Sequence, residues 1–64
     1  MRASYQGISY RIEELGNGMW EWSFQPPTGA RQTGRVRGEG RWAATVARRA
    51  INIWHLMNRG SQAA

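Results

Sequence analysis

The stretch MWEWSF at residues 19–24 places aromatic side chains on alternate positions, and this spacing constrains the fold more than any other feature of the chain. In a β-strand alternate residues face the same side, so Trp20, Trp22 and Phe24 share one face and Glu21 lies on the other. Two interpretations follow. The aromatic side chains either form an exposed platform on which nucleic-acid bases stack, or they are the hydrophobic core.

Burial energetics favour the core. If the aromatic side chains were exposed, Glu21 would have to face the interior, and burying an unpaired carboxylate costs several kcal/mol. Each buried aromatic or aliphatic side chain instead contributes about 1.5–3 kcal/mol. The strand therefore predicts a sheet whose aromatic face is covered by another element.

The flanking sequence predicts a three-stranded antiparallel meander, with strands at about residues 5–14, 19–25 and 30–37. Asn17 and Gly18 form a strong hairpin signal between the first two strands, because both residues accept a positive φ. The segment 26–29, PPTG, ends the second strand and begins a longer turn. The third strand is the least supported by its composition, and we expect it to be short or bulged at Gly34.

From Trp42 the hydrophobic period becomes helical, which predicts an α+β fold with one C-terminal amphipathic helix at about residues 41–58 packed on one face of the sheet. The expected core-facing arc holds Trp42, Ala43, Val46, Ala47, Ala50, Ile53, Trp54 and Met57. The opposite, polar arc holds Thr45, Arg48, Asn52, His55 and Arg59. Gly60 is expected to end the helix, giving a single domain over residues 1–60 and a frayed tail at 61–64.

The charge of the chain is strongly unbalanced. Its 64 residues include nine basic residues, all arginine, and four acidic residues, all glutamate, for a net charge of +5. Such a charge favours a polyanionic partner. The absence of cysteine makes a reducing cytoplasm the expected compartment.

The composition disfavours an enzyme. Cysteine, lysine and aspartate are absent, and the single histidine, His55, is too little for a metal site. The GEG sequence at residues 38–40 matches no phosphate-binding fingerprint, so we expect a simple turn there. The sequence therefore predicts no catalytic residues, no metal and no cofactor.

The parity of the third strand directs arginines away from the helix. Val36 is its one bulky apolar residue and should face inward, so its neighbours face outward. The helix-free face is then expected to carry Arg11, Arg31, Thr33, Arg35 and Arg37. Two interpretations remain open: this face contacts phosphates, or Glu13 and Glu21 neutralise it by cross-strand pairing. Arg48 and Asn52 on the polar arc of the helix either add further contacts or simply face solvent.

A three-stranded meander with an arginine-bearing outer face and one C-terminal helix resembles the small DNA-binding domains of the AP2 type and the N-terminal arm-binding domains of tyrosine recombinases. The sequences WEWSF and AATVARRAI stand where those families have an aromatic-x-aromatic strand and an alanine-rich helix. The families' sequence around the third strand is not reproduced in TGRVRGEGRW. The resemblance implies that the outer sheet face enters the major groove of DNA, through Arg11, Arg31, Arg35 and Arg37.

The sequence thus predicts a small basic nucleic-acid-binding module, for DNA rather than RNA, of the kind that phages, plasmids or bacteria carry. The alternative is a protein-interaction module, such as a small inhibitor or adaptor, that docks an acidic protein surface. A homodimer also fits, because the polar third strand is an exposed sheet edge. Membrane binding is disfavoured, because the core requires the apolar face of the helix.

Overall fold

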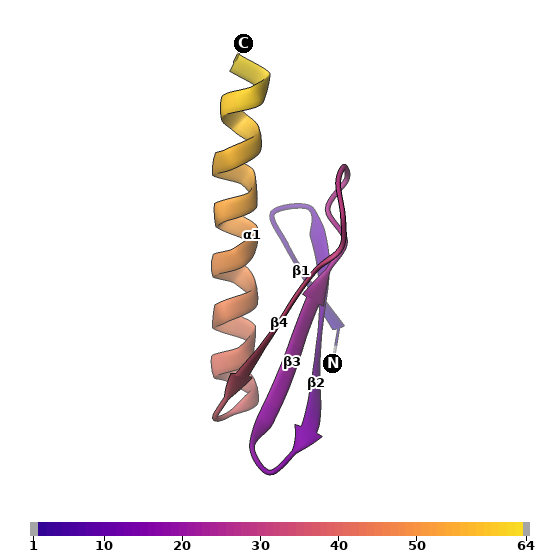
Figure 1. Cartoon of the computed structure of the whole chain (residues 1–64), viewed down its shortest axis with the longest axis vertical. Coiled ribbons are helices and arrows are strands. Elements are labelled where there is room, and N and C mark those ends of the chain that lie inside the picture. Colours follow the sequence, from indigo (N-terminus) through magenta and orange to yellow (C-terminus); the bar gives the residue numbers. More distant parts are fainter. Residues whose placement is uncertain (1, 64) are drawn as a thin grey trace.

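Within residues 2–63 the chain forms four consecutive antiparallel strands followed by one helix. The computed structural model describes the backbone of residues 2–63 and the side chains of residues 2–58. The elements are β1 Arg2–Tyr5, β2 Ile8–Gly16, β3 Met19–Phe24, β4 Gln32–Arg37 and α1 Gly40–Ala63. The strands lie in sequence order in one sheet, and α1 runs along one side of it (Figure 1). The α+β class with an antiparallel sheet and one C-terminal helix is confirmed, but the prediction of three strands is wrong.

The additional strand comes from a second hairpin at the N-terminus. The segment predicted as one strand over residues 5–14 turns back at Gln6 and Gly7, whose φ angles are 51° and 81°. Two consecutive positive φ angles are the geometry of a two-residue hairpin turn. Tyr5 therefore pairs with Ile8, and β1 becomes an edge strand beside β2.

The two later connections follow the sequence more closely. Asn17 and Gly18 form the predicted hairpin turn between β2 and β3, with φ angles of 54° and 72°. The proline-containing connection then runs over residues 25–31, where the Gln25 side-chain amide donates to the Gly29 carbonyl at 3.1 Å. β4 begins at Gln32, so it is shorter than the predicted 30–37.

Gly34 is not at a bulge. The pairing of β3 with β4 is regular through Gly34, and the irregularity of the sheet lies in β2 between Glu14 and Gly16. The indole of Trp22, the cross-strand partner of Gly34, occupies the space above this glycine. A Cβ atom at position 34 would lie 2.4 Å from Cζ2 of Trp22. Glycine here makes room for the core.

The prediction that the aromatic residues of β3 form the core is confirmed. Phe24 is 2% exposed, and the half-buried Trp20 and Trp22 pack against the core cluster. The buried residues of that cluster are Ile8, Tyr10, Ile12, Phe24, Ala43, Ala44, Ala47 and Ile51. Val36 faces inward with them, as predicted, opposite Trp20.

Trp20 also fixes the link between β4 and α1. Its indole N–H donates to the Gly38 carbonyl at 2.8 Å, and the Gly38 N–H donates to the Gly18 carbonyl at 2.8 Å. The ring lies against Gly40, where an added Cβ would be 3.0 Å from Cη2. Gly38 and Glu39 are thus held as a tight link beside the β2–β3 hairpin, and Gly40 begins α1.

The helix is rotated relative to the prediction. Trp42, Ile53 and Met57, expected to face the sheet, are 43%, 56% and 72% exposed. Ala44 and Ile51 are buried in their place. This correction concerns the apolar arc, half of which still reaches the core through Ala43, Ala47, Ala50 and Trp54.

The polar arc of the helix meets the N-terminal hairpin, which explains the rotation. The Tyr5 hydroxyl donates to Oδ1 of Asn52 at 3.2 Å, and Nη1 of Arg48 donates to the Tyr10 hydroxyl at 3.3 Å. Nε2 of His55 lies 3.3 Å from the Gln6 carbonyl. β1 widens the sheet beyond β2 and adds the Tyr5 hydroxyl to that of Tyr10 on β2, so both are available to polar groups of the helix on that side.

The helix extends beyond its predicted end. It continues past Gly60 to Ala63, whereas the sequence predicts an end near residue 58. The side chain of Arg59, placed on the polar arc by the sequence, lies outside the described side chains, and of the predicted tail at 61–64, residue 64 lies outside the described backbone. In the described part of the chain, α1 is not apolar enough along its length to cross a membrane.

The packing of Trp22 over Gly34 gives a first prediction. Gly34→Ala should lower the free energy of unfolding by about 1–3 kcal/mol, because the added methyl group overlaps the indole. In a Trp22→Leu background the same substitution should be neutral or stabilising, since alanine loses less conformational entropy than glycine. Urea denaturation of the four proteins measures both effects, and equal destabilisation in the two backgrounds would contradict this packing.

Candidate nucleic-acid interface

The side of the sheet that faces away from α1 gathers most of the strand arginines. Because paired residues of an antiparallel sheet share a face, the register defines this surface. We call it the outer face, and it consists of Arg2, Ser4, Ser9, Arg11, Glu13, Met19, Glu21, Ser23, Thr33, Arg35 and Arg37.

Two arginines lie directly opposite each other on the outer face. Arg2 of β1 is the Cα partner of Arg11 of β2. Like charges at directly opposed positions repel, so this pair destabilises the isolated sheet. An anion placed between the two guanidinium groups would remove that repulsion.

The two glutamates of the outer face each contact one arginine. Nη2 of Arg11 lies 3.0 Å from Oε1 of Glu13, and Nε of Arg35 lies 3.7 Å from Oε2 of Glu21. All four side chains are at least 39% exposed. Exposed ion pairs of this kind contribute about 0–1 kcal/mol, so a phosphate can replace the carboxylate at little cost.

Arg2 and Arg37 form no ion pair with any described carboxylate. Both are exposed, and they lie on the two edge strands, β1 and β4. The outer face therefore keeps a positive excess that extends across the full width of the sheet. Its small hydroxyl residues, Ser4, Ser9, Ser23 and Thr33, leave room between the arginines and can donate hydrogen bonds.

The structure brings together four of the seven residues that the sequence singled out. Arg11, Thr33, Arg35 and Arg37 lie on the outer face. Arg31 precedes β4 in the β3–β4 connection, exposed but outside the sheet pairing.

Arg48 and Asn52 are separate from this group. They lie on α1, on the other side of the sheet, where their side chains bond to Tyr10 and Tyr5. Their polar groups link the helix to the sheet.

Arg2 is the functional candidate that the sequence reasoning missed. The signal was present in two places: the alternation of RASY at residues 2–5, and the following Gln6-Gly7 pair, which permits a tight turn. Treating residues 5–14 as one strand hid both.

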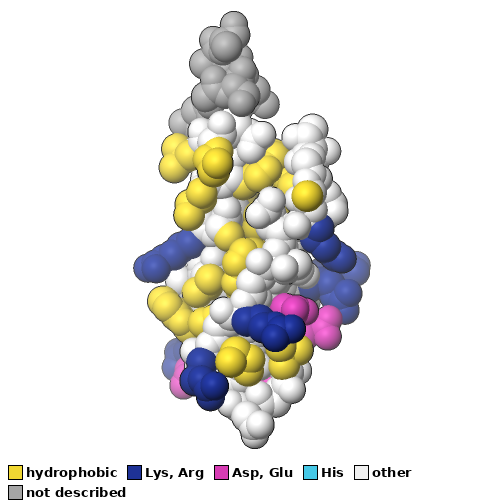
Figure 2. Space-filling model, viewed as in Figure 1, with side chains coloured by type: hydrophobic (Ala, Val, Ile, Leu, Met, Phe, Trp, Pro, Cys, Tyr) yellow, Lys and Arg dark blue, Asp and Glu magenta, His cyan; other side chains and the backbone are white. Residues whose placement is uncertain are grey.

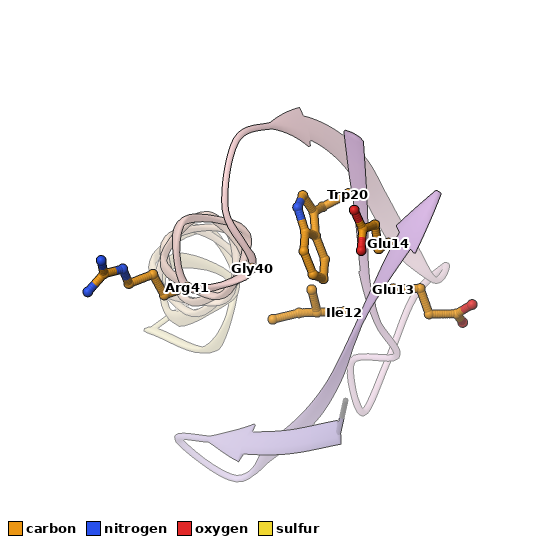
Figure 3. Close-up of a pocket in the computed structure, with 6 residues that line it drawn as sticks. All are labelled: Ile12, Glu13, Glu14, Trp20, Gly40 and Arg41. Carbon is orange, nitrogen blue, oxygen red and sulfur yellow. The ribbon is translucent and has the colours of Figure 1, made fainter. Parts of the chain in front are cut away.

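A cavity of about 550 Å³ opens at the other end of the core, between the β2–β3 hairpin and the start of α1. Figure 3 shows Glu14 beside the Trp20 ring, with Glu13 and Arg41 pointing away from it. The Trp20 indole N–H is already bonded to Gly38. Among the described residues, no three of the types His, Cys, Asp and Glu cluster as metal ligands would. The arginines of the outer face are therefore the stronger candidate site.

The chain matches no protein-family model, and no curated protein or solved structure gives a significant match. The resemblance to AP2-type and recombinase arm-binding domains stays a prediction, and this sheet has one strand more than that architecture.

The bond between Tyr5 and Asn52 gives a second prediction. Tyr5→Phe and Asn52→Ala should each lower the free energy of unfolding by about 1 kcal/mol, because each removes one side of a half-buried hydrogen bond. The double variant should lose less than the sum, since both substitutions remove the same interaction. Thermal or urea unfolding of the four proteins measures the coupling. Strictly additive losses would contradict a direct bond between β1 and α1.

Proposed function

We propose that this protein is a small nucleic-acid-binding module that contacts its ligand through the outer face, with duplex DNA as the preferred ligand. The observation that carries the proposal is the arginine distribution of that face: four arginines on three of the four strands, β1, β2 and β4, with Arg2 directly opposite Arg11. Arginine suits phosphate recognition, because its planar guanidinium can donate two parallel hydrogen bonds.

The arrangement of the face supports contact with a backbone of regularly spaced phosphates. Arg2 and Arg37 are free of described carboxylates, while the exposed pairs of Arg11 and Arg35 can exchange a glutamate for a phosphate. The serine and threonine hydroxyls between them can donate to phosphate oxygens. Arginines that reach base edges in the major groove would select guanine, which presents two acceptors there.

The opposite face of the sheet forms the core with α1. Its aromatic side chains pack against α1, so they are not available to stack on bases. Binding then depends on electrostatics and hydrogen bonds, and duplex ligands should be preferred to single strands, whose recognition relies on aromatic stacking. An acidic protein surface is the alternative partner, and it would meet the same arginines.

The third prediction tests the role of the unpaired arginines. With four phosphate contacts, the logarithm of the affinity for duplex DNA should fall with the logarithm of salt concentration with a slope of about −3.6. Arg2→Gln/Arg37→Gln should reduce that slope by about 1.8 and weaken binding on the order of 50-fold at 0.1 M salt. Fluorescence anisotropy with a labelled duplex over a salt series measures both quantities.

The matched control is Arg41→Gln/Arg49→Gln, which removes the same charge from exposed positions on α1. It should change the slope little, because those arginines lie on the other side of the molecule. Equal effects of the two double variants would contradict a site on the outer face. Absence of wild-type binding to duplex and single-stranded DNA and RNA would overturn the proposal and favour the acidic protein surface.

A further inference from the structure

Two further features of the molecule are the backbone edge of β4 and an apolar part of the α1 surface, and the proposed nucleic-acid contacts use neither. One is the free edge of β4, which is the last strand of the sheet. The other is an apolar strip of α1 formed by Trp42, Val46, Ile53 and Met57, which we call the helix strip. At 100° per residue these four residues fall within an arc of about 60°.

The edge of β4 carries unused backbone hydrogen-bonding groups. The Gly38 N–H points toward the β3 side of β4, where it donates to the carbonyl of Gly18, the turn residue directly before β3. Backbone groups alternate in direction along a strand, so those of Gln32, Gly34 and Val36 also point toward β3. The N–H and C=O groups of Thr33, Arg35 and Arg37 therefore point away from the sheet, toward an additional strand.

Ile53 and Met57 of the helix strip border this same edge. A cavity of about 250 Å³ separates Gln32 of β4 from α1, and Ala50, Ile53, Trp54, Met57 and Asn58 line its helix side. The other flank of α1 faces the N-terminal hairpin through Arg48 and Asn52. In Figure 2 hydrophobic side chains run along the molecule between the helix side and the sheet side. Monomeric proteins rarely leave large apolar side chains so exposed in one continuous region.

We propose that a second copy of this chain covers this side, through antiparallel pairing of the two β4 edges about a two-fold axis at Gly34. In this register Thr33 of each copy forms a hydrogen-bonded pair with Arg35 of the other, using the edge groups that point outward. The two sheets become one sheet of eight strands, with both helices on the same side. The interface is isologous, so each copy contributes the same surface.

The charges of β4 select this register. Within β4, pairing about Gly34 places Arg35 opposite a threonine, whereas an axis at residue 35 would place Arg35 directly opposite its own copy. Continued beyond β4, the same register would set Arg37 opposite Arg31, so the paired segment is limited to residues 32–36. Like charges directly opposed are destabilising. On the inner face the same register places Gln32 opposite Val36, both uncharged. The Trp22 indole, which lies over Gly34, is then close to the axis and becomes covered.

The helix strip is also self-complementary under this two-fold axis. Antiparallel β4 strands bring the N-terminal half of one helix toward the C-terminal half of the other. Trp42 and Val46 of one copy then lie toward Ile53 and Met57 of the other, beside the cavity next to Gln32. Ala50 lies between them along the strip, and its small side chain permits close approach. Arg49 lies on the arc facing away from the sheet, where its guanidinium carbon is 5.6 Å from the centre of the Trp42 ring.

A stable dimer has to cover a sizeable part of the surface of a chain this small. A standard interface buries about 800 Å² per partner, which is about a fifth of the 4544 Å² that the chain exposes. The core of a single copy is small, and its largest fully buried side chains are Phe24, Ile12 and Ile51. Chains of this size commonly gain stability by association.

Hydrogen exchange measured at several protein concentrations tests the register directly. The amides of Thr33 and Arg35 should become protected as concentration rises, because they then donate to each other's residue on the second copy. The amides of Gln32, Gly34 and Val36 donate to β3 in either state and serve as the internal control. Sedimentation equilibrium over the same concentrations should give the mass of a dimer.

Two variants address the two halves of the interface. Thr33→Pro removes an edge N–H that the β3–β4 ladder does not use, so it should yield a folded monomer. Met57→Glu should raise the dimer dissociation constant at least about ten-fold, because it buries a charge in the helix strip. Leu15→Glu is the matched control: Leu15 is exposed like Met57 but lies at the end of β2, so its dimer should be retained.

A wild-type protein that stays monomeric at several hundred micromolar would overturn the proposal. So would a dimer that survives both Thr33→Pro and Met57→Glu, since it must form elsewhere. Neither result depends on nucleic acid, because the measurements are made without it. Failure of DNA binding with an intact dimer would therefore leave this inference standing.

Discussion

The fold depends on the contact between the aromatic row of β3 and the small residues that receive it. Trp22 lies over Gly34, and Trp20 lies against Gly40 while its N–H holds the Gly38 carbonyl. The facing helix surface is built of alanines, two of them completely buried. Large side chains on the sheet thus meet glycine and alanine on its neighbours, which lets a short chain reach close packing without a large core.

This contact also determines what the opposite face of the sheet can be. Once the aromatic residues of β3 face α1, the strand period of two directs Glu21 outward, and Arg35 follows across the β3–β4 pairing. The packing of the core does not determine which residue types occupy the outer face. The outer face carries opposed arginines at Arg2 and Arg11, an arrangement that the core does not require. An anionic ligand bound between them would offset their repulsion.

The sequence was sufficient for the strands and turns whose signals are local, and insufficient where an element depends on its neighbours. The alternation in β3, the Asn17-Gly18 turn and the inward Val36 follow from residue types alone. The N-terminal hairpin did not, because a positive φ at a residue such as Gln6 is unusual. The predicted site lacks Arg2 for the same reason, since Arg2 joins the outer face only when β1 is present.

The rotation of α1 has the same origin and a wider consequence. On a sheet of three strands, the middle of the apolar arc would face the sheet. In this structure the polar arc bonds to two tyrosine hydroxyls, Tyr5 on β1 and Tyr10 on β2. The helix turns toward them, and Trp42 and Met57 are left beside the edge of β4. The strand that adds Arg2 to the outer face thus also uncovers the helix strip. If two copies join there, their outer faces merge into one surface, and each polyanion would meet twice the number of arginines at a fixed spacing. In this way one N-terminal hairpin links the charge of the sheet to the association of the chain.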